Sequence, residues 1–189
     1  MDLFDLVSRN RSFRKFDQNH PVERELLEKL VGLARLSASG ANRQLLRFMV
    51  FNSKPDCGKI FPTLAWAAYL KEWPGPSEGE RPTAYIIILG DKSTTEGFGV
   101  DHGIAAQSIM LGATEAGLGG CMIGSIAKDA LRKAVSIPED YAILLVVALG
   151  KPAEKVVIDP VVRGDIKYWR DSNGIHHVPK RSLDELIIN

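Results

Sequence analysis

The sequence has little of what several specialised protein classes need. Its 189 residues include two cysteines and four histidines, and the formal net charge is +1. Cys57 and Cys121 follow no metal-ligand or redox spacing, so we expect two buried free thiols rather than a disulfide or a zinc site. A net charge this small argues against a general binder of nucleic acid or of membrane surfaces. We therefore expect neither nucleic acid nor membrane as a partner.

Long apolar runs are also missing. The best run, residues 142–149, has the length of a strand and is too short to cross a bilayer. Asp2 and Asp5 stand where a secretory leader would be basic and apolar, so we expect no signal peptide and a cytoplasmic location. The composition, with 45% hydrophobic and 25% charged residues, is ordinary for a soluble globular protein. The length suits a single domain over residues 1–189.

Several catalytic signatures are absent from the chain. It contains no Walker glycine loop, no His-Glu-x-x-His and no Gly-x-Ser-x-Gly motif, and residues 117–122 fail the dinucleotide fingerprint because they end in Met122. His176 and His177 are neighbours, and neighbouring side chains in a strand point to opposite faces. We therefore predict no metal site, and no side chain is assigned as a catalytic acid or base.

Hydrophobic periodicity predicts a mixture of helices and buried strands, that is, an α/β or α+β domain. The proline-rich stretch 73–82 is typical of a surface loop. From residue 151 onward, prolines, charges and Trp169 predict an extended tail (151–189), which would become ordered by wrapping a second subunit. The expected helices cover residues 2–8, 23–34, 53–70, 103–116 (with Asp101 as N-cap) and 128–135, and the expected strands 47–51, 84–90, 119–123 and 141–149.

Two short basic clusters, each with a hydroxyl, lie near the two ends of the chain. Residues 10–16 read Asn-Arg-Ser-Phe-Arg-Lys-Phe and residues 177–182 read His-Val-Pro-Lys-Arg-Ser. Arg, Lys and Ser donors together can saturate the oxygens of one phosphate if the fold brings both ends together. Solvated basic turns are the simpler interpretation of either cluster alone.

A third polar segment, residues 38–44, reads Ala-Ser-Gly-Ala-Asn-Arg-Gln. Asn and Gln side chains donate and accept at once, which suits a ring edge with alternating carbonyl and N–H groups. An ordinary helix-to-strand turn is the alternative, because Ser, Gly and Asn are common in turns.

Taken together, these segments resemble the nitroreductase family of FMN-dependent oxidoreductases over nearly the whole chain. The resemblance implies an α+β sandwich with a central mixed, mainly antiparallel sheet flanked by helices, in an intertwined homodimer with two FMN sites at its interface. The sequence departs from many relatives at Leu45-Leu46, where they carry Pro-Trp, and at Asn10, where some carry the first phosphate arginine. The matching segments are residues 11–17, 38–44, 101–107, 117–124, 149–152 and 178–181.

The resemblance also implies which residues bind the cofactor. The N-terminal and C-terminal basic residues would hold the flavin phosphate, and Arg14 would also stabilise negative charge on the reduced flavin. The polar loop would reach the isoalloxazine or ribityl group from the partner subunit, and the backbone at 123–124 would run close to flavin N5. The implied set is Arg11, Ser12, Arg14, Ser39, Asn42, Gln44, Ile123, Gly124, Lys180 and Arg181.

The implied activity is a ping-pong transfer of two electrons. NADH or NADPH would donate hydride to flavin N5 and leave, and an electron-poor small molecule, such as a nitroaromatic or quinone, would then take the electrons. Residues 69–81, with Trp66, Tyr69 and Trp73, would cover the acceptor pocket, plain packing being the alternative.

Other functions stay open. They are a family relative with other flavin chemistry (dehydrogenation, dehalogenation or flavin fragmentation), a non-enzymatic FMN-binding protein, and a binder of a phosphorylated metabolite. The sequence names neither the acceptor nor the preferred nicotinamide.

Overall fold

The main sheet is antiparallel and has its longest strand in the middle. The computed structural model describes residues 2–93, 95 and 97–189. In this sheet β2 pairs with β3 and β3 with β5, while β1 and β4 both pair with β5, and every one of these ladders is antiparallel. A parallel bridge joins Ser12 to Gly120. The expected mainly antiparallel sheet is thus confirmed. The strands are β1 (Phe16–Asp17), β2 (Leu46–Phe51), β3 (Ala84–Asp91), β4 (Gly119–Ile123) and β5 (Tyr141–Pro152).

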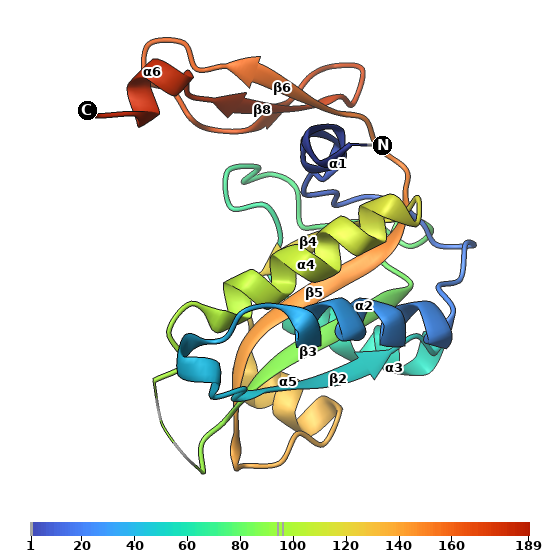
Figure 1. The fold of residues 1–189 in the computed structure, drawn as a ribbon. Helices are drawn as coiled ribbons and strands as arrows, with labels where there is room; N and C mark the ends of the chain where they lie inside the picture. The colour runs from blue at the N-terminus through green and yellow to red at the C-terminus, as the bar shows by residue number, and fades with distance from the viewer. Residues whose placement is uncertain (1, 94, 96) are drawn as a thin grey trace.

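Strand β3 lies at the centre because its apolar run is buried on both faces. Alternate side chains point to opposite sides of the sheet. Ile86 and Ile88 pack with α2 (Arg24–Leu36) and α4 (Asp101–Glu115), whereas Tyr85 and Ile87 pack with α3 (Lys54–Ile60) and α5 (Lys128–Ala134). Figure 1 shows α2 and α4 running across one face of the sheet. The sheet is therefore sandwiched between two helical layers.

Two expectations for the helices were wrong. The helix predicted over residues 53–70 ends as α3 at Ile60 and continues only as the 3-10 turn η2 (Phe61–Thr63). Beyond it, Leu64 bridges Ile126 and Ala67 has φ = 44°, a left-handed conformation that an α-helix excludes. Asp101 is the first residue of α4, and Val100 is its N-cap.

The C-terminal segment is more structured than an extended tail. Strand β5 runs on to Pro152, and the chain then forms a three-stranded sheet in the order β6-β8-β7, with β6 and β8 parallel. Figure 1 shows this small sheet apart from the two helical layers, on the side of the N-terminal helix α1 (Leu3–Arg9). No helix in the described ranges combines the length and apolarity of a membrane span. The elements are β6 (Val156–Pro160), β7 (Trp169–Arg170), β8 (His176–Lys180) and α6 (Leu183–Leu186).

Candidate functional site

The N-terminal basic segment is fixed along β4. The Phe13 amide donates to the carbonyl oxygen of Gly120 at 2.9 Å, next to the bridge between Ser12 and Gly120. A Cβ on Gly119 would lie 2.5 Å from Phe13 Cδ2, and one on Gly120 would lie 2.6 Å from the Ala148 carbonyl oxygen. The two glycines therefore leave the room that this close approach needs.

Arg11 and Ser12 keep hydrogen-bond donors free. Arg11 Nη2 donates to the Val7 carbonyl at 2.8 Å, but its Nε is buried and has no partner. Burial lowers the pKa of the Arg11 guanidinium. The Ser12 side chain is exposed, and its hydroxyl makes no hydrogen bond to the described residues. A buried, unpaired guanidinium nitrogen and a free hydroxyl on the next residue are both donors that suit an anionic oxygen such as that of a phosphate.

Arg14, in contrast, is held by the C-terminal segment. Its Nη1 lies 3.0 Å from His176 Nε2, its guanidinium stacks over Tyr168 at 4.7 Å, and its amide donates to Glu154. His176 is fully buried, and burial, together with Arg14 and Arg170, lowers its pKa to about 4. The imidazole is thus neutral at pH 7, so Nε2 accepts a hydrogen bond from Arg14 and orients its charge.

The same segment fastens the loop that precedes β3. Glu154 and Arg170 form an ion pair of 2.8 Å whose side chains are 2% and 15% exposed, and Arg170 stacks over Trp73 at 4.7 Å. The Tyr69 amide donates to the Tyr168 hydroxyl at 3.3 Å, and the two rings lie 4.9 Å apart. Sequence reasoning missed these tail residues, because nothing in the sequence indicates which loop they contact.

Ile123 is the last residue of β4, and Gly124 follows it beside the start of that loop. The Ala65 amide donates to the Ser125 carbonyl at 3.0 Å, which places Gly124 near the segment leading to Trp66. Gly124 is exposed, and a Cβ added to it would meet nothing within 4 Å. The backbone at this position therefore borders open space.

Residues 39–44, here called the η1 loop because they contain the 3-10 turn η1 (Gly40–Asn42), sit on the start of α4. The Ser39 hydroxyl donates to Asp101 Oδ2 at 2.7 Å, and the next backbone amide donates to Oδ1 at 3.1 Å. These hydrogen bonds lower the pKa of Asp101. Ala41 and Gln44 have φ of 50° and 52°, a left-handed conformation that is strained for these residue types. Strain of this kind is typical of functional loops.

Within one chain the η1 loop lies far from the N-terminal segment. The loop contacts the first residue of α4, whereas the N-terminal segment runs along β4, which follows the last turn of α4. Helix α4 has 15 residues. At about 1.5 Å per residue it separates the two segments by roughly 22 Å, and Figure 1 shows them at opposite ends of the helix. A single chain does not bring them together.

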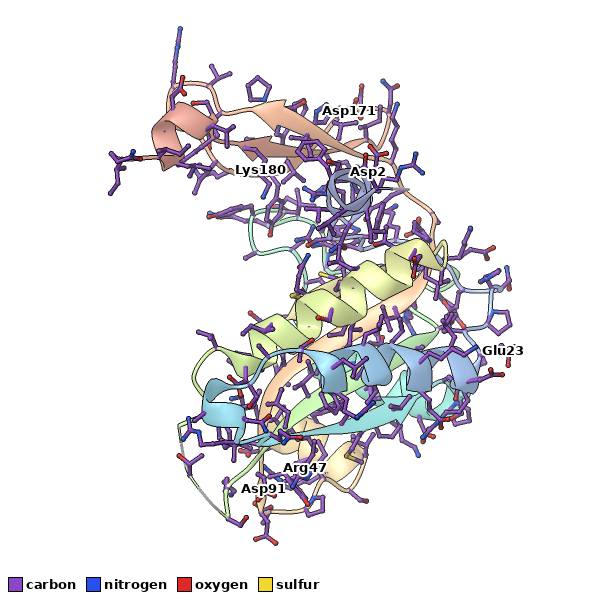
Figure 2. The ribbon with its side chains drawn as sticks, in the orientation of Figure 1. Asp2, Glu23, Arg47, Asp91, Asp171 and Lys180 are labelled. Atoms are coloured by element: carbon purple, nitrogen blue, oxygen red, sulfur yellow. The ribbon has the colours of Figure 1, made fainter. Side chains whose placement is uncertain are left out.

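The C-terminal basic residues are also apart from this group. Lys180 ends β8, four residues beyond His176, or roughly 13 Å along a strand. Figure 2 shows Lys180 on the small sheet. It is exposed and forms no ion pair with any residue that the structure describes, and Arg181 pairs with Glu185 at 3.2 Å. One chain thus gathers only the N-terminal segment, Ile123–Gly124, the Trp66–Trp73 loop and the tail residues that hold Arg14.

Comparisons with known proteins agree with this architecture. The model of the nitroreductase family matches residues 7–151. A Methanothermobacter thermautotrophicus relative named "Putative NADH dehydrogenase/NAD(P)H nitroreductase" is 30% identical over an alignment of 161 residues, and the match covers 82% of this chain and 79% of the relative. An FMN-dependent nitroreductase from Clostridium difficile R20291 superimposes with a TM-score of 0.66 at 24% identity, over 81% of this chain and 89% of that one.

A further solved structure has a similar fold. It comes from Bacteroides thetaiotaomicron, with a TM-score of 0.67 and 24% identity over 86% of this chain and 92% of that one. The family match ends at residue 151, at the end of the main sheet and before the small C-terminal sheet begins.

Proposed function

Because this chain belongs to the nitroreductase family, we propose that it is an FMN-dependent oxidoreductase acting between NADH or NADPH and a small, electron-poor acceptor such as a nitroaromatic or a quinone. When bound, FMN supplies the redox chemistry, accepting two electrons from the nicotinamide and passing them to the acceptor in a separate half-reaction. The observation that carries the proposal is the N-terminal segment, where Arg11 Nε is buried and unpaired beside the free Ser12 hydroxyl.

The chain's own residues would bind and orient the cofactor. Arg11 and Ser12 would hold the phosphate. The open backbone at Gly124 would let the flavin ring lie close to β4. Arg14, fixed by His176, would keep a positive charge near the ring, where negative charge develops on reduction.

We infer that the active form is a homodimer, because the cofactor set is split along α4. The η1 loop of one subunit, with Ser39, Asn42 and Gln44, would complete the site of the other. Exposed apolar side chains on α1 and α2 support this arrangement: Leu3, Phe4 and Leu36 are 70%, 81% and 72% exposed. A hollow of about 410 Å³ lies between α1, α2 and α4. Contiguous apolar surface of this kind marks an interface.

The colour and reduction of the purified protein test the activity. We expect a yellow protein whose visible flavin absorbance bleaches on anaerobic stopped-flow mixing with NADH or NADPH. Steady-state rates with a quinone should then give parallel double-reciprocal lines. Bound flavin that is not bleached by either nicotinamide would indicate a flavin-binding protein instead, and a colourless folded protein would contradict the cofactor assignment.

Subunit complementation tests the site residues and the shared site together. Arg11→Ala with Ser12→Ala breaks one side of the site, and Asn42→Ala with Gln44→Ala breaks the other. Each variant homodimer should be folded but bind FMN weakly, whereas co-expressed subunits should recover one intact site per heterodimer. No recovery in a verified heterodimer would show that each site lies within one chain.

A further inference from the structure

A cavity of about 500 Å³ opens on the α3 side of the sheet. It lies between α3, the stretch after β1 (residues 18–21) and the stretch before β3 (residues 78–83). None of the residues expected to bind the cofactor lines it. A volume of this size is within the range of small-molecule sites, about 300–1,000 Å³. The cavity is therefore a candidate site separate from the proposed flavin site.

Several polar groups of the lining hold the walls in place. Gln18 Oε1 accepts hydrogen bonds from the backbone amides of residues 79 and 81 at 2.7 and 3.3 Å. The side-chain amide of Asn52 donates to the Val22 carbonyl at 3.0 Å, and the Thr83 hydroxyl donates to the His20 carbonyl at 2.9 Å. Hydrogen bonds within the chain therefore join the stretch after β1 to the stretch before β3 and hold these walls of the cavity.

Two lining groups have no such partner. Tyr85 is fully buried, and its hydroxyl makes no hydrogen bond. Arg81 Nε is also buried and unpaired, and the Arg81 guanidinium stacks over the Phe61 ring at 4.3 Å without pairing to a carboxylate of any described residue. Buried donors without partners are rare in folded proteins, because leaving one unpaired is costly. Their coincidence at one cavity points to a ligand that accepts hydrogen bonds.

The charges around the cavity favour an anion. Lys54, Arg81 and Glu78 are the charged residues of the lining, and of these Lys54 and Glu78 are exposed whereas Arg81 is half-buried. Burial raises the pKa of the Tyr85 hydroxyl, so this group is a donor at every physiological pH. Burial likewise raises the pKa of Cys57 to about 11, so the cavity presents a neutral thiol and no thiolate. The Tyr85 hydroxyl and the half-buried Arg81 guanidinium are therefore the donors that would meet an anion.

We propose that this cavity binds a small organic carboxylate with a flat apolar body. The carboxylate would accept hydrogen bonds from the Arg81 guanidinium and the Tyr85 hydroxyl, since the fork of an arginine suits a carboxylate well. The apolar body would lie against the Phe61 ring and the neighbouring Pro21 and Pro82, which also line the cavity. This proposal does not depend on the oxidoreductase activity, because it uses none of the flavin-site residues.

Calorimetric titration of the purified protein with benzoate tests the proposal, with benzyl alcohol as the uncharged comparison. We expect one benzoate per chain, no change in the visible flavin spectrum, and benzyl alcohol binding at least about tenfold more weakly. Tyr85→Phe should weaken benzoate about tenfold by removing one hydrogen bond to a charged group. Arg81→Gln should weaken it further, because it removes the positive charge.

A variant that fills the cavity, Gly58→Leu, is paired with a control elsewhere in the chain, Gly32→Leu. Gly58 lines the cavity, and a Cβ placed there meets nothing within 4 Å, so Gly58→Leu should fold and block binding. Gly32 in α2 is equally open and does not line the cavity, so Gly32→Leu should bind benzoate normally.

Three outcomes would overturn the proposal. They are an absence of benzoate binding, binding unchanged by both Tyr85→Phe and Gly58→Leu, and binding that perturbs the flavin spectrum. Tyr85→Phe should keep or raise the melting temperature of the free protein, because it removes an unpaired buried hydroxyl. Tyr85→Phe therefore tests the binding proposal even if Arg81→Gln fails to fold.

Discussion

The main sheet and the small C-terminal sheet are stabilised by different kinds of contact. Strand β3 of the main sheet is buried along nearly all its length and packs apolar side chains on both faces. The small sheet has one buried residue, His176, and is held by ion pairs and ring stacking, including the Glu154–Arg170 pair and Trp169 on His177 at 4.1 Å. The first kind of contact is insensitive to pH, and the second depends on charge.

The boundary between the two kinds of contact lies close to the end of the family match. The family match covers the main sheet and ends before the small sheet. The small sheet nevertheless reaches back to the proposed flavin site through Arg14, which it holds with Glu154, Tyr168 and His176. We therefore expect damage to the main sheet to unfold the protein, and damage to the small sheet to release Arg14 and the Trp66–Trp73 loop.

The largest effect is expected in the main sheet. Ile88→Ala creates a cavity beneath α2 and α4 and should lower the free energy of unfolding by about 4 kcal/mol. Ile158→Ala in β6 removes a side chain that is 48% exposed and should cost less than about 1 kcal/mol. Urea unfolding followed by circular dichroism measures both. Equal losses would show that the two sheets form one cooperative core.

The second-largest effect is expected from removing the Glu154 carboxylate, which joins the C-terminal segment to the N-terminal segment. Glu154→Gln leaves the largely buried Arg170 guanidinium without its ion pair and weakens the hold on the Arg14 and Lys15 amides, at a cost of about 3 kcal/mol. We expect faster hydrogen exchange and proteolysis in residues 153–189 and unchanged protection in β3 and β5. Glu185→Gln, at an exposed pair on α6, is the matched control and should change little. Faster hydrogen exchange in β3 would mean that the contacts of Glu154 support the whole fold.

The main sheet was predictable because its signal is local. The run at Ile86–Leu89 predicts a buried strand from the sequence alone. The end of α3 was not predictable, because the pairing of Leu64 with Ile126 overrides local helical preference. His176, Arg170 and Glu154 act through partners 16 to 162 positions away, as in the contact between Arg14 and His176, and no local pattern encodes that pairing.

A change of pH should loosen the small sheet and spare the main one. His176 has its pKa lowered from 6.5 to about 4 in the folded protein by burial, Arg14, Arg170 and His177. Below pH 6.5 the detached segment therefore binds a proton at His176 that the folded segment does not bind. The stability of the folded segment is thus full above pH 6.5 and decreases as the pH falls towards 4. The loss should be about 2 kcal/mol between pH 7 and pH 5. Hydrogen exchange in residues 153–189 measures it.

His176→Gln is the control for that titration. It keeps a hydrogen-bond acceptor for Arg14 and cannot take up a proton in this range. Exchange in the segment should then depend much less on pH between 5 and 7. The same pH dependence in the variant would assign the effect to other groups.

The smallest effect is expected at the turn between β7 and β8. Gly174 has φ = 78°, and a Cβ there would meet nothing within 4 Å, so Gly174→Ala tests backbone strain without a steric clash. We expect Gly174→Ala to destabilise the small sheet by about 1 kcal/mol and Gly174→Asn by less, since Asn tolerates the left-handed conformation. Local hydrogen exchange at His176 and His177 should report the loss while global unfolding in urea stays unchanged. A shift in global unfolding would instead couple this turn to the main sheet, against the independence argued above.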